Sequence, residues 1–355
     1  MNLFGEYYRQ YFDLHGLLHS SGCADAASVS FLADSDQRTV ATGRSLATGM
    51  FPGCTVAIRS LPGGRPYPLF HSLSAGVSHA DHALAAAAVS GRIGNDPTGL
   101  AEAYAPALQD MEKILSACDT PVACNPEKRS LLSSASSVVA GKGDHLVDLR
   151  GPLDSAKTIA ENFLLEYSDG MPINKVGWGR VDIAKINEFM TLHTAYSDLL
   201  QRTPYLARVQ ASNLMYHILA TMQQARDQRK VAGALGKPGD KVVFLIGHDT
   251  NIAAVAGMLD ISWIIDGRRD DTPPGGALVF ELWTSPDTSK NTVHIYYLSQ
   301  TLNQMRNLTA LTLDTPPARA NVFVPGCSSA DREYSCQWSG FTHVVKSAIE
   351  PASVE

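Results

Sequence analysis

The sequence predicts an α/β fold, in which a mostly parallel sheet flanked by helices is interrupted by an inserted, mainly helical domain. Near both ends of the chain, short apolar runs that suit buried strands alternate with longer amphipathic stretches. From about residue 76 the strand-like runs give way to alanine-rich helical patterns. We therefore expect a discontinuous core of residues 1–75 and 236–355, with residues 76–235 forming the second domain.

The first part of the core is predicted to alternate helices and strands. Residues 2–19 form an amphipathic helical pattern, and residues 27–33 a short strand pattern. Residues 36–50 are predicted as the next helix and residues 54–59 as the second strand. Such alternation is typical of parallel sheets.

The middle of the chain is predicted to be mainly helical, whereas strands are predicted again toward its end. Alanine-rich helical runs cover 82–89 and 100–104, and helical patterns continue around 101–117, 153–168, 183–202 and 205–231. Loops rich in Gly, Pro and Ser lie near 120–144 and 169–180. Strand patterns resume at 241–247, 277–283 and 293–298, with a helix predicted over 251–259. The chain is therefore expected to return to the sheet after the helical domain.

Composition excludes several classes of protein. The chain has 355 residues, of which 45% are hydrophobic and 18% charged, as in ordinary globular proteins. A net charge of −6 argues against non-specific nucleic-acid binding, and no apolar stretch is long enough to span a membrane. No Cys/His cluster has zinc spacing, so neither a metal nor another cofactor is expected. We expect a monomer.

The six cysteines fall in sequence-local pairs: Cys23 with Cys54, Cys118 with Cys124, and Cys327 with Cys336. An even number of cysteines in such pairs indicates disulfides and an oxidising compartment. The alternative is free cysteines in the core.

A candidate site follows the strand pattern Val242–Ile246. Gly247 ends the strand, and His248 and Asp249 precede the next helix. Ligands of open α/β sheets bind at the carboxyl ends of strands, and the N–H groups of a helix start favour an anion. The alternative is that Asp249 or Thr250 only caps the helix and His248 is a turn residue.

A second candidate site follows the strand pattern that ends at Ala33. Asp34 and Asp36 precede Arg38, which falls in the first turn of the predicted helix. A cation there opposes the helix dipole, whereas a guanidinium is well suited to grip a bound phosphate. The alternative is a surface arginine paired with Asp34 or Asp36.

Together these segments resemble the histidine acid phosphatases, in the branch of bacterial periplasmic phytases and glucose-1-phosphatases. The resemblance extends over nearly the whole chain. It rests on Asp34-x-Asp36-x-Arg38-Thr39-x-x-Thr42-Gly43, Gly177-Trp178-Gly179-Arg180, Leu200-Gln201-Arg202-Thr203-Pro204, Gly247-His248-Asp249-Thr250-Asn251, Asp271-Thr272-Pro273-Pro274-Gly275-Gly276, Gln300-Thr301-Leu302 and Gly340-Phe341.

The resemblance implies a role for each matching residue. Arg38, beside Asp34, would bind the scissile phosphate, and His248 would bind a phosphoryl oxygen and stabilise charge in the transition state. Asp249 would be the general acid, which at an ordinary pKa near ~3.9 implies an acidic working pH. Thr250 and Met171 would contact the substrate. The pairs Cys23–Cys54, Cys118–Cys124 and Cys327–Cys336 match disulfides of this branch.

One motif of the family is absent. The nucleophilic histidine lies in Arg-His-Gly-x-Arg-x-Pro at the end of the first strand, and this sequence does not contain that motif. We expect that the first strand, the nucleophile and two phosphate-binding arginines are missing by truncation. That absence would leave an unpaired strand edge and an apolar slot beside residues 242–247.

No other histidine is expected to replace the nucleophile. His15 precedes a glycine but lacks the preceding arginine and the following Arg-x-Pro. The others are predicted to be surface or packing residues: His19, His71, His79, His82, His145, His193, His217, His294 and His343.

The resemblance implies an acid phosphomonoesterase that acts through a phosphohistidine on a small-molecule phosphate monoester, either phytate or a sugar phosphate. The Asp249-Thr250 pair and residues 272–276 favour a phytase, whereas the spacer 173–176 favours a glucose-1-phosphatase. The chain as given is expected to have little or no activity, and a non-catalytic phosphoester-binding protein is the other alternative. The full-length parent is expected to be periplasmic or secreted, with no nucleic-acid or membrane partner.

Overall fold

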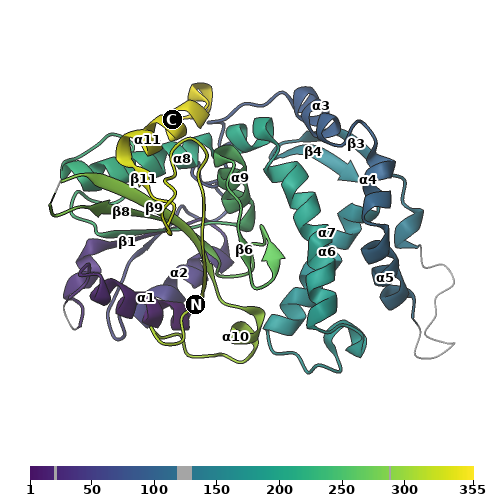
Figure 1. Cartoon of the computed structure of the whole chain (residues 1–355), viewed down its shortest axis with the longest axis horizontal. Helices are drawn as coiled ribbons and strands as arrows, with labels where there is room; N and C mark the ends of the chain where they lie inside the picture. The colour runs from purple at the N-terminus through teal and green to yellow at the C-terminus, as the bar shows by residue number, and fades with distance from the viewer. Residues whose placement is uncertain (20–21, 118–129, 288) are drawn as a thin grey trace.

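The computed structural model describes residues 1–19, 22–117, 130–287 and 289–355 (Figure 1). Its helices are α1 Asn2–Leu14, α2 Gln37–Met50, α3 His82–Arg92, α4 Pro97–Ala103, α5 Ala105–Ser116, α6 Pro152–Ser168, α7 Ile183–Gln201, α8 Pro204–Asp227, α9 Asp249–Leu259, α10 Leu302–Arg306 and α11 Trp338–Ala348. Its strands are β1 Val29–Ala33, β2 Ile58–Arg59, β3 Ser137–Lys142, β4 His145–Arg150, β5 Val242–Ile246, β6 Ile264–Ile265, β7 Arg268–Arg269, β8 Ala277–Thr284, β9 Asn291–Ser299, β10 Ala318–Asn321 and β11 Cys336–Gln337.

The predicted α/β fold is confirmed, and its parallel part is the sheet β2-β1-β5. Every residue of β1 is buried, as its apolar sequence predicts for a strand covered on both faces. Phe31 pairs with Phe244 and Ala33 with Ile246, so β1 and β5 end in step. The residues that follow the two strands are therefore brought to one edge of the sheet.

The strands after β5 pair differently from the prediction of a mostly parallel sheet. β8 and β9 form an antiparallel pair, and β9 also pairs in antiparallel fashion with β10 and β11. Only a short connection separates β8 from β9, which permits a hairpin but not a parallel crossover. Among the described strands, parallel pairing is therefore found only in β2-β1-β5, and candidate site residues follow β1 and β5.

The two sheets occupy one layer because the same helices cover both. On one face, the ring of Phe244 in β5 lies 5.4 Å from that of Tyr8 in α1, and Tyr11 of α1 donates a hydrogen bond to Glu281 of β8. On the other face, Leu245 and Phe280 belong to the same apolar cluster, which includes residues of α8, α9 and α11. β5 and β8 thus share the helices that cover them on both faces.

β5 and β8 nevertheless form no hydrogen-bonded pair among the described residues. In the part of the chain that the structure describes, β5 pairs with β1 alone and β8 with β9 alone. Residues 242–245 and 277–282 are only half-buried, although helices cover both faces of the layer. Among the described residues, β5 therefore has an unpaired edge on the side away from β1.

Glycines allow α1 and α2 to pack closely against each other. A Cβ on Gly5 would lie 2.2 Å from the carbonyl oxygen of Leu46, and one on Gly49 would lie 2.0 Å from that of Asn2. The predicted helix over residues 2–19 ends at Leu14, and Gly16 adopts a φ of +70° that a right-handed helix does not contain.

The helices α3 to α7 surround a separate apolar cluster and lie to the right of β1, β8 and β9 in Figure 1. α8 joins the two parts, since Leu206 belongs to this cluster whereas Leu214 belongs to the cluster on the sheet. The predicted domain boundaries near residues 76 and 235 remain a prediction. The prediction of a loop near 120–144 was wrong for its last part, because β3 and β4 form a hairpin there. Gly143 lies in the hairpin turn with a φ of +61°.

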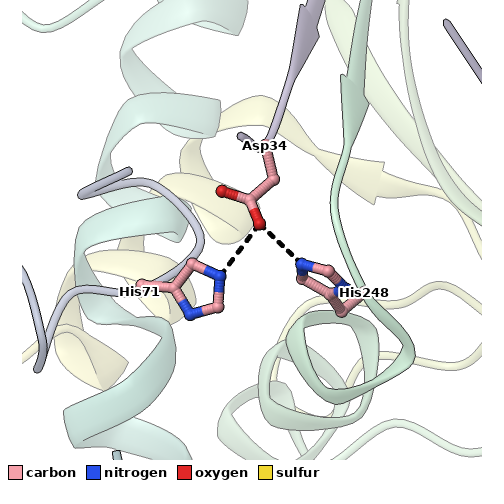
Figure 2. A group of neighbouring side chains, drawn as sticks. All are labelled: Asp34, His71 and His248. Atoms are coloured by element: carbon pink, nitrogen blue, oxygen red, sulfur yellow. Dashed lines mark hydrogen bonds and ion pairs between the residues drawn. The ribbon is translucent and has the colours of Figure 1, made fainter. Parts of the chain in front are cut away.

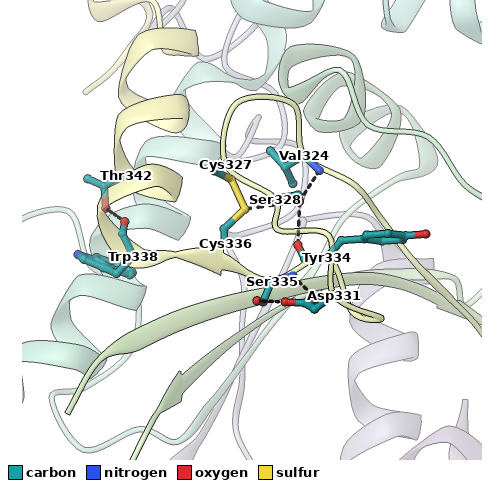
Figure 3. Close-up of a disulfide and its surroundings, with 9 residues drawn as sticks. All are labelled: Val324, Cys327, Ser328, Asp331, Tyr334, Ser335, Cys336, Trp338 and Thr342. Carbon is teal, nitrogen blue, oxygen red and sulfur yellow. Dashed lines mark hydrogen bonds between the residues drawn. A yellow bond between two sulfur atoms is a disulfide. The ribbon is translucent and has the colours of Figure 1, made fainter. Parts of the chain in front are cut away.

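Two of the predicted disulfides are present. Cys23–Cys54 links the segments before β1 and after α2, and Cys327–Cys336 closes a loop that ends at β11 (Figure 3). Within that loop, Ser328 accepts a hydrogen bond from the N–H of Val324 and donates one to the carbonyl of Tyr334. The predicted pair Cys118–Cys124 lies outside the described residues. In the described part of the chain, none of the helices is long and apolar enough to cross a membrane.

Candidate functional site

Three segments bring polar side chains together at the carboxyl ends of β1 and β5. Asp34 follows β1, His248 follows β5, and His71 comes from the loop between β2 and α3 (Figure 2). The carboxylate of Asp34 is fully buried, and its Oδ2 atom lies 2.7 Å from Nε2 of His248 and 2.9 Å from Nε2 of His71. One carboxylate oxygen therefore orients two imidazoles.

The segment Gly247–Asn251 is shaped by two local requirements. A Cβ on Gly247 would lie 2.5 Å from the ring of Phe70, so only glycine fits beneath that loop. Asn251 accepts a hydrogen bond from the N–H of His248 at 2.9 Å and donates one to the carbonyl of Phe70 at 2.9 Å. Asn251 thus fixes the start of α9 and also the loop that carries His71.

Arg38 approaches His248 from the opposite side. Its NH2 group lies 2.9 Å from Nδ1 of His248 and 3.2 Å from a carboxylate oxygen of Asp36. A guanidinium has donors only, so Nδ1 of His248 must be unprotonated and its ring proton must sit on Nε2. His248 then donates to Asp34 and accepts from Arg38, which defines its tautomer.

The ionisation of Asp34 follows from these contacts. Burial alone would raise the pKa of Asp34, but the hydrogen bonds from His248 and His71 outweigh it and leave the pKa below its ordinary value of 3.8. The carboxylate is therefore charged at neutral pH.

The remaining predicted residues differ in position. Asp249 and Thr250 begin α9 directly after His248, and both are exposed. Met171 packs against the helical cluster, and its carbonyl accepts a hydrogen bond from Arg306 at 2.8 Å. The structure thus unites Asp34, Arg38 and His248 and places Asp249 beside them, but none of the described contacts of Met171 reaches them.

His71 was wrongly predicted as a surface or packing residue. Its half-exposed ring points at Asp34, and its Nδ1 lies 3.6 Å from a carboxylate oxygen of Asp144 in the β3–β4 turn. Asp144 in turn accepts hydrogen bonds from the backbone N–H of Ser74, at 2.7 Å, and from the Ser74 hydroxyl. No sequence spacing links these residues, because they meet only through the folding of distant segments.

His15 lies elsewhere. It follows the last residue of α1, and its ring packs 4.4 Å from that of Tyr11 and 5.5 Å from that of Trp283. It also lines a cavity of about 150 Å³ with Glu281 and His294. None of its described contacts is with Arg38 or His248.

Comparison with known proteins agrees with the resemblance found in the sequence. Residues 1–298 match the family model for the histidine phosphatase superfamily (branch 2). Phytase AppA of Escherichia coli (strain K12) is 34% identical over 354 residues, which cover 98% of this chain and 81% of that protein. Glucose-1-phosphatase of Providencia rettgeri is 30% identical over 350 residues, which cover 98% of this chain and 80% of that protein.

Solved structures give the same result. Hafnia alvei phytase in complex with tartrate superimposes with a TM-score of 0.90 at 34% identity, covering 100% of this chain and 86% of that one. The phytase from Citrobacter braakii has a TM-score of 0.86 at 29% identity, covering 99% of this chain and 88% of that one. The chain therefore belongs to branch 2 of the histidine phosphatase superfamily and is a phosphoric monoester hydrolase by family, with small phosphate esters as the substrate class.

Proposed function

We propose that this chain binds the phosphoryl group of a small phosphate monoester between Arg38, His248 and the first turn of α9. The contact that carries the proposal is the 2.9 Å approach of the exposed Arg38 guanidinium to His248, with the buried Asp34 carboxylate behind the ring. A guanidinium and the N–H groups of a helix start are the groups that bind phosphate oxygens in proteins.

Binding of a phosphate would rearrange the hydrogen bonds of His248. The phosphoryl oxygens take the donors of Arg38, which releases Nδ1 of His248. Nδ1 would then face the bound phosphoryl group, while Nε2 keeps its hydrogen bond to Asp34 at 2.7 Å.

Asp249 is proposed as the general acid. It directly follows His248 and is exposed, so its carboxyl can reach the leaving oxygen of an ester held by Arg38 and His248. This role requires a protonated carboxyl, so activity would be favoured at acidic pH.

The sequence lacks the histidine motif that supplies the nucleophile in this family. The family motif Arg-His-Gly-x-Arg-x-Pro does not occur in the sequence, and Nε2 of His71 is engaged by Asp34. We therefore propose that this chain binds phosphate esters but has little or no turnover, since a covalent mechanism loses its first step without a nucleophile. Binding without turnover is also what a non-catalytic phosphoester-binding protein would show, and that is the second candidate function.

An inositol polyphosphate is the proposed ligand, and a sugar phosphate the alternative. Phytase AppA is 34% identical, against 30% for the glucose-1-phosphatase of Providencia rettgeri. Hafnia alvei phytase, at 35% identity, has been solved with myo-inositol hexakis sulphate. Substrate contacts by Thr250 and Met171 stay part of this proposal.

The proposed compartment is oxidising, either the periplasm or the extracellular space. The disulfides Cys23–Cys54 and Cys327–Cys336 support it, because disulfides persist in such compartments and are rare in the cytosol. A monomeric state remains part of the proposal.

Binding of myo-inositol hexakis sulphate, measured by calorimetry, tests the proposed site without requiring turnover. Arg38→Ala should weaken binding about 10-fold or more, since a charge-assisted hydrogen bond contributes about 1.5–3 kcal/mol. Arg44→Ala, an exposed arginine of the same helix, is the matched control and should leave the affinity unchanged. Equal effects of the two substitutions would refute the site, and tighter binding of glucose 1-phosphate would refute the ligand class.

Hydrolysis of p-nitrophenyl phosphate at acidic pH tests the chemistry. Turnover should be absent or close to the background rate. Full activity would contradict the account of the nucleophile. If turnover is measurable, Asp249→Asn should lower it, and an unchanged rate in that variant would contradict the proposed acid.

A further inference from the structure

The triad of Asp34, His71 and His248 has a donor set that the phosphate-binding proposal does not require. One carboxylate oxygen and two ring nitrogens, from three separate segments, lie within 4.8 Å of one another. Asp34 is fully buried, and the ring of His248 is almost fully buried. This arrangement is not a run of exposed acidic groups but an enclosed carboxylate facing two imidazoles (Figure 2).

We propose that Asp34, His71 and His248 form a binding site for a divalent transition cation of the zinc type. The ligand atoms would be Oδ2 of Asp34 and the two Nε2 atoms. Imidazole nitrogen and carboxylate oxygen are standard zinc ligands, and three protein ligands leave a fourth position open. The absence of zinc spacing in the sequence does not exclude the site, because its ligands come from three segments.

The present distances are close to those that a cation requires. Bonds of about 2.0–2.2 Å in tetrahedral geometry place neighbouring ligand atoms roughly 3.4 Å apart. Oδ2 of Asp34 lies 2.7 Å from Nε2 of His248 and 2.9 Å from Nε2 of His71, so these separations must open by about 0.7 Å and about 0.5 Å. The half-exposed ring of His71, on a loop, can supply the second movement, whereas the first requires a shift of Asp34 or His248.

Asp144, which is not one of the proposed ligands, supports the site because it lies beside the second nitrogen of His71. A histidine that binds a metal almost always donates its other ring N–H to a carboxylate, a carbonyl or water. Asp144 lies 3.6 Å from Nδ1 of His71, and Ser74 holds that carboxylate in place through its backbone N–H and hydroxyl. With a cation on Nε2, the ring proton of His71 would face Asp144.

The cation would compete with phosphate binding. A cation on Nε2 of His248 moves the ring proton to Nδ1, which can then no longer accept the hydrogen bond from Arg38. Arg38 is 74% exposed and can turn away toward Asp36. The inhibitory consequence rests on the proposed function, whereas binding of the cation does not.

The test is a calorimetric titration of Zn²⁺ into the metal-free chain, prepared without a polyhistidine tag. We expect one saturable site with a dissociation constant in the micromolar range or below. His71→Asn should weaken it about 100-fold or more because a ligand is lost, and Asp144→Asn should weaken it about 10-fold through its partner. His294→Asn is the control, since His294 pairs with Glu333 at 2.6 Å and should leave the affinity unchanged.

Two further measurements keep the test decisive. Circular dichroism shows whether each variant is folded, and Asp144→Asn tests the site even if His71→Asn unfolds. Co²⁺ in place of Zn²⁺ should produce visible absorption that is lost in His71→Asn. No saturable binding, or equal weakening by His71→Asn and His294→Asn, would overturn the proposal. Because the titration measures binding alone, absent turnover does not affect it, and loss of zinc binding leaves the phosphate-ester experiments valid.

Discussion

Oδ2 of Asp34 and Nε2 of His248 lie 2.7 Å apart, across the ends of two adjacent parallel strands. This hydrogen bond places a charged carboxylate behind an imidazole whose other nitrogen faces Arg38. The stability of the strand ends and the orientation of the candidate phosphate site therefore depend on the same side chain.

The first prediction concerns that carboxylate. Asp34→Asn retains the size of the side chain but removes the charge that accepts from two imidazoles. We expect the free energy of unfolding in urea to fall by about 2 kcal/mol, the cost of leaving buried polar groups poorly paired. Asp36→Asn, at a half-exposed carboxylate, should change it by less than about 0.5 kcal/mol. Equal losses would show that burial of Asp34 has no special importance.

The second prediction is a dependence on acidic pH. The pKa of Asp34 is lower in the folded protein than its ordinary value of 3.8, so the unfolded chain binds the proton more tightly. The stabilisation by Asp34 is therefore complete above that ordinary value and is lost as the pH falls through the folded pKa. Urea unfolding at a series of acidic pH values should show the gap between wild type and Asp34→Asn closing. A constant gap would contradict the charge-based account.

The third prediction concerns alkaline pH. Burial and the nearby Glu281 carboxylate raise the pKa of Tyr11 from 10.0 to about 12. The folded state thus retains the phenolic proton longer than the unfolded chain, and the stabilisation is complete below the unfolded pKa and lost as the pH rises toward the folded one. Tyr11→Phe removes this ionisation, so its free energy of unfolding should fall less steeply with pH, by up to about 2 kcal/mol over that range. Parallel curves would refute the assignment.

The fourth prediction concerns Cys23–Cys54. The disulfide joins residues 31 positions apart, and in the chain-entropy model a loop of that length is worth about 3.7 kcal/mol. The double variant Cys23→Ala/Cys54→Ala should lose that order of stability in denaturant unfolding. If the two proteins had the same free energy of unfolding in the absence of reductant, the presence of the disulfide would be contradicted.

The fifth prediction concerns amide exchange in β5. The backbone N–H groups of β5 that point away from β1 have no strand partner among the described residues. We expect these amides to exchange with solvent faster than those of β1, which has a strand on each side. Hydrogen exchange followed by NMR measures the two strands separately, and uniform protection of both would show that β5 has another partner.

The strands of the candidate site could be predicted from sequence because their apolar runs end in chemically distinctive residues. His248 and Asp249 lie within three residues of the end of the run Val242–Ile246. Asp34 and Arg38 likewise lie within five residues of Ala33, where the other run ends. The resemblance to a family then supplied their roles.

His71 and the β3–β4 hairpin could not be predicted in the same way. His71 reaches Asp34 because Asn251 holds the Phe70 carbonyl, a contact between segments far apart in sequence. Ser137–Lys142 contains too few apolar residues for a clear alternating pattern, so its hairpin partner, rather than its own sequence, identifies it as a strand. The antiparallel pairing of β8 with β9 depends likewise on the short connection between them.

Among the described residues, no strand pairing joins the sheet β2-β1-β5 to the sheet around β9. Side chains of α1 pack against both sheets on one face, and side chains of α9 and α11 do so on the other. Loosening of α1 would remove Tyr8 from Phe244 and Tyr11 from Glu281 together, so both sheets would lose their common cover in one step. The cooperativity of unfolding therefore depends on a helix that contributes no residue to the candidate site.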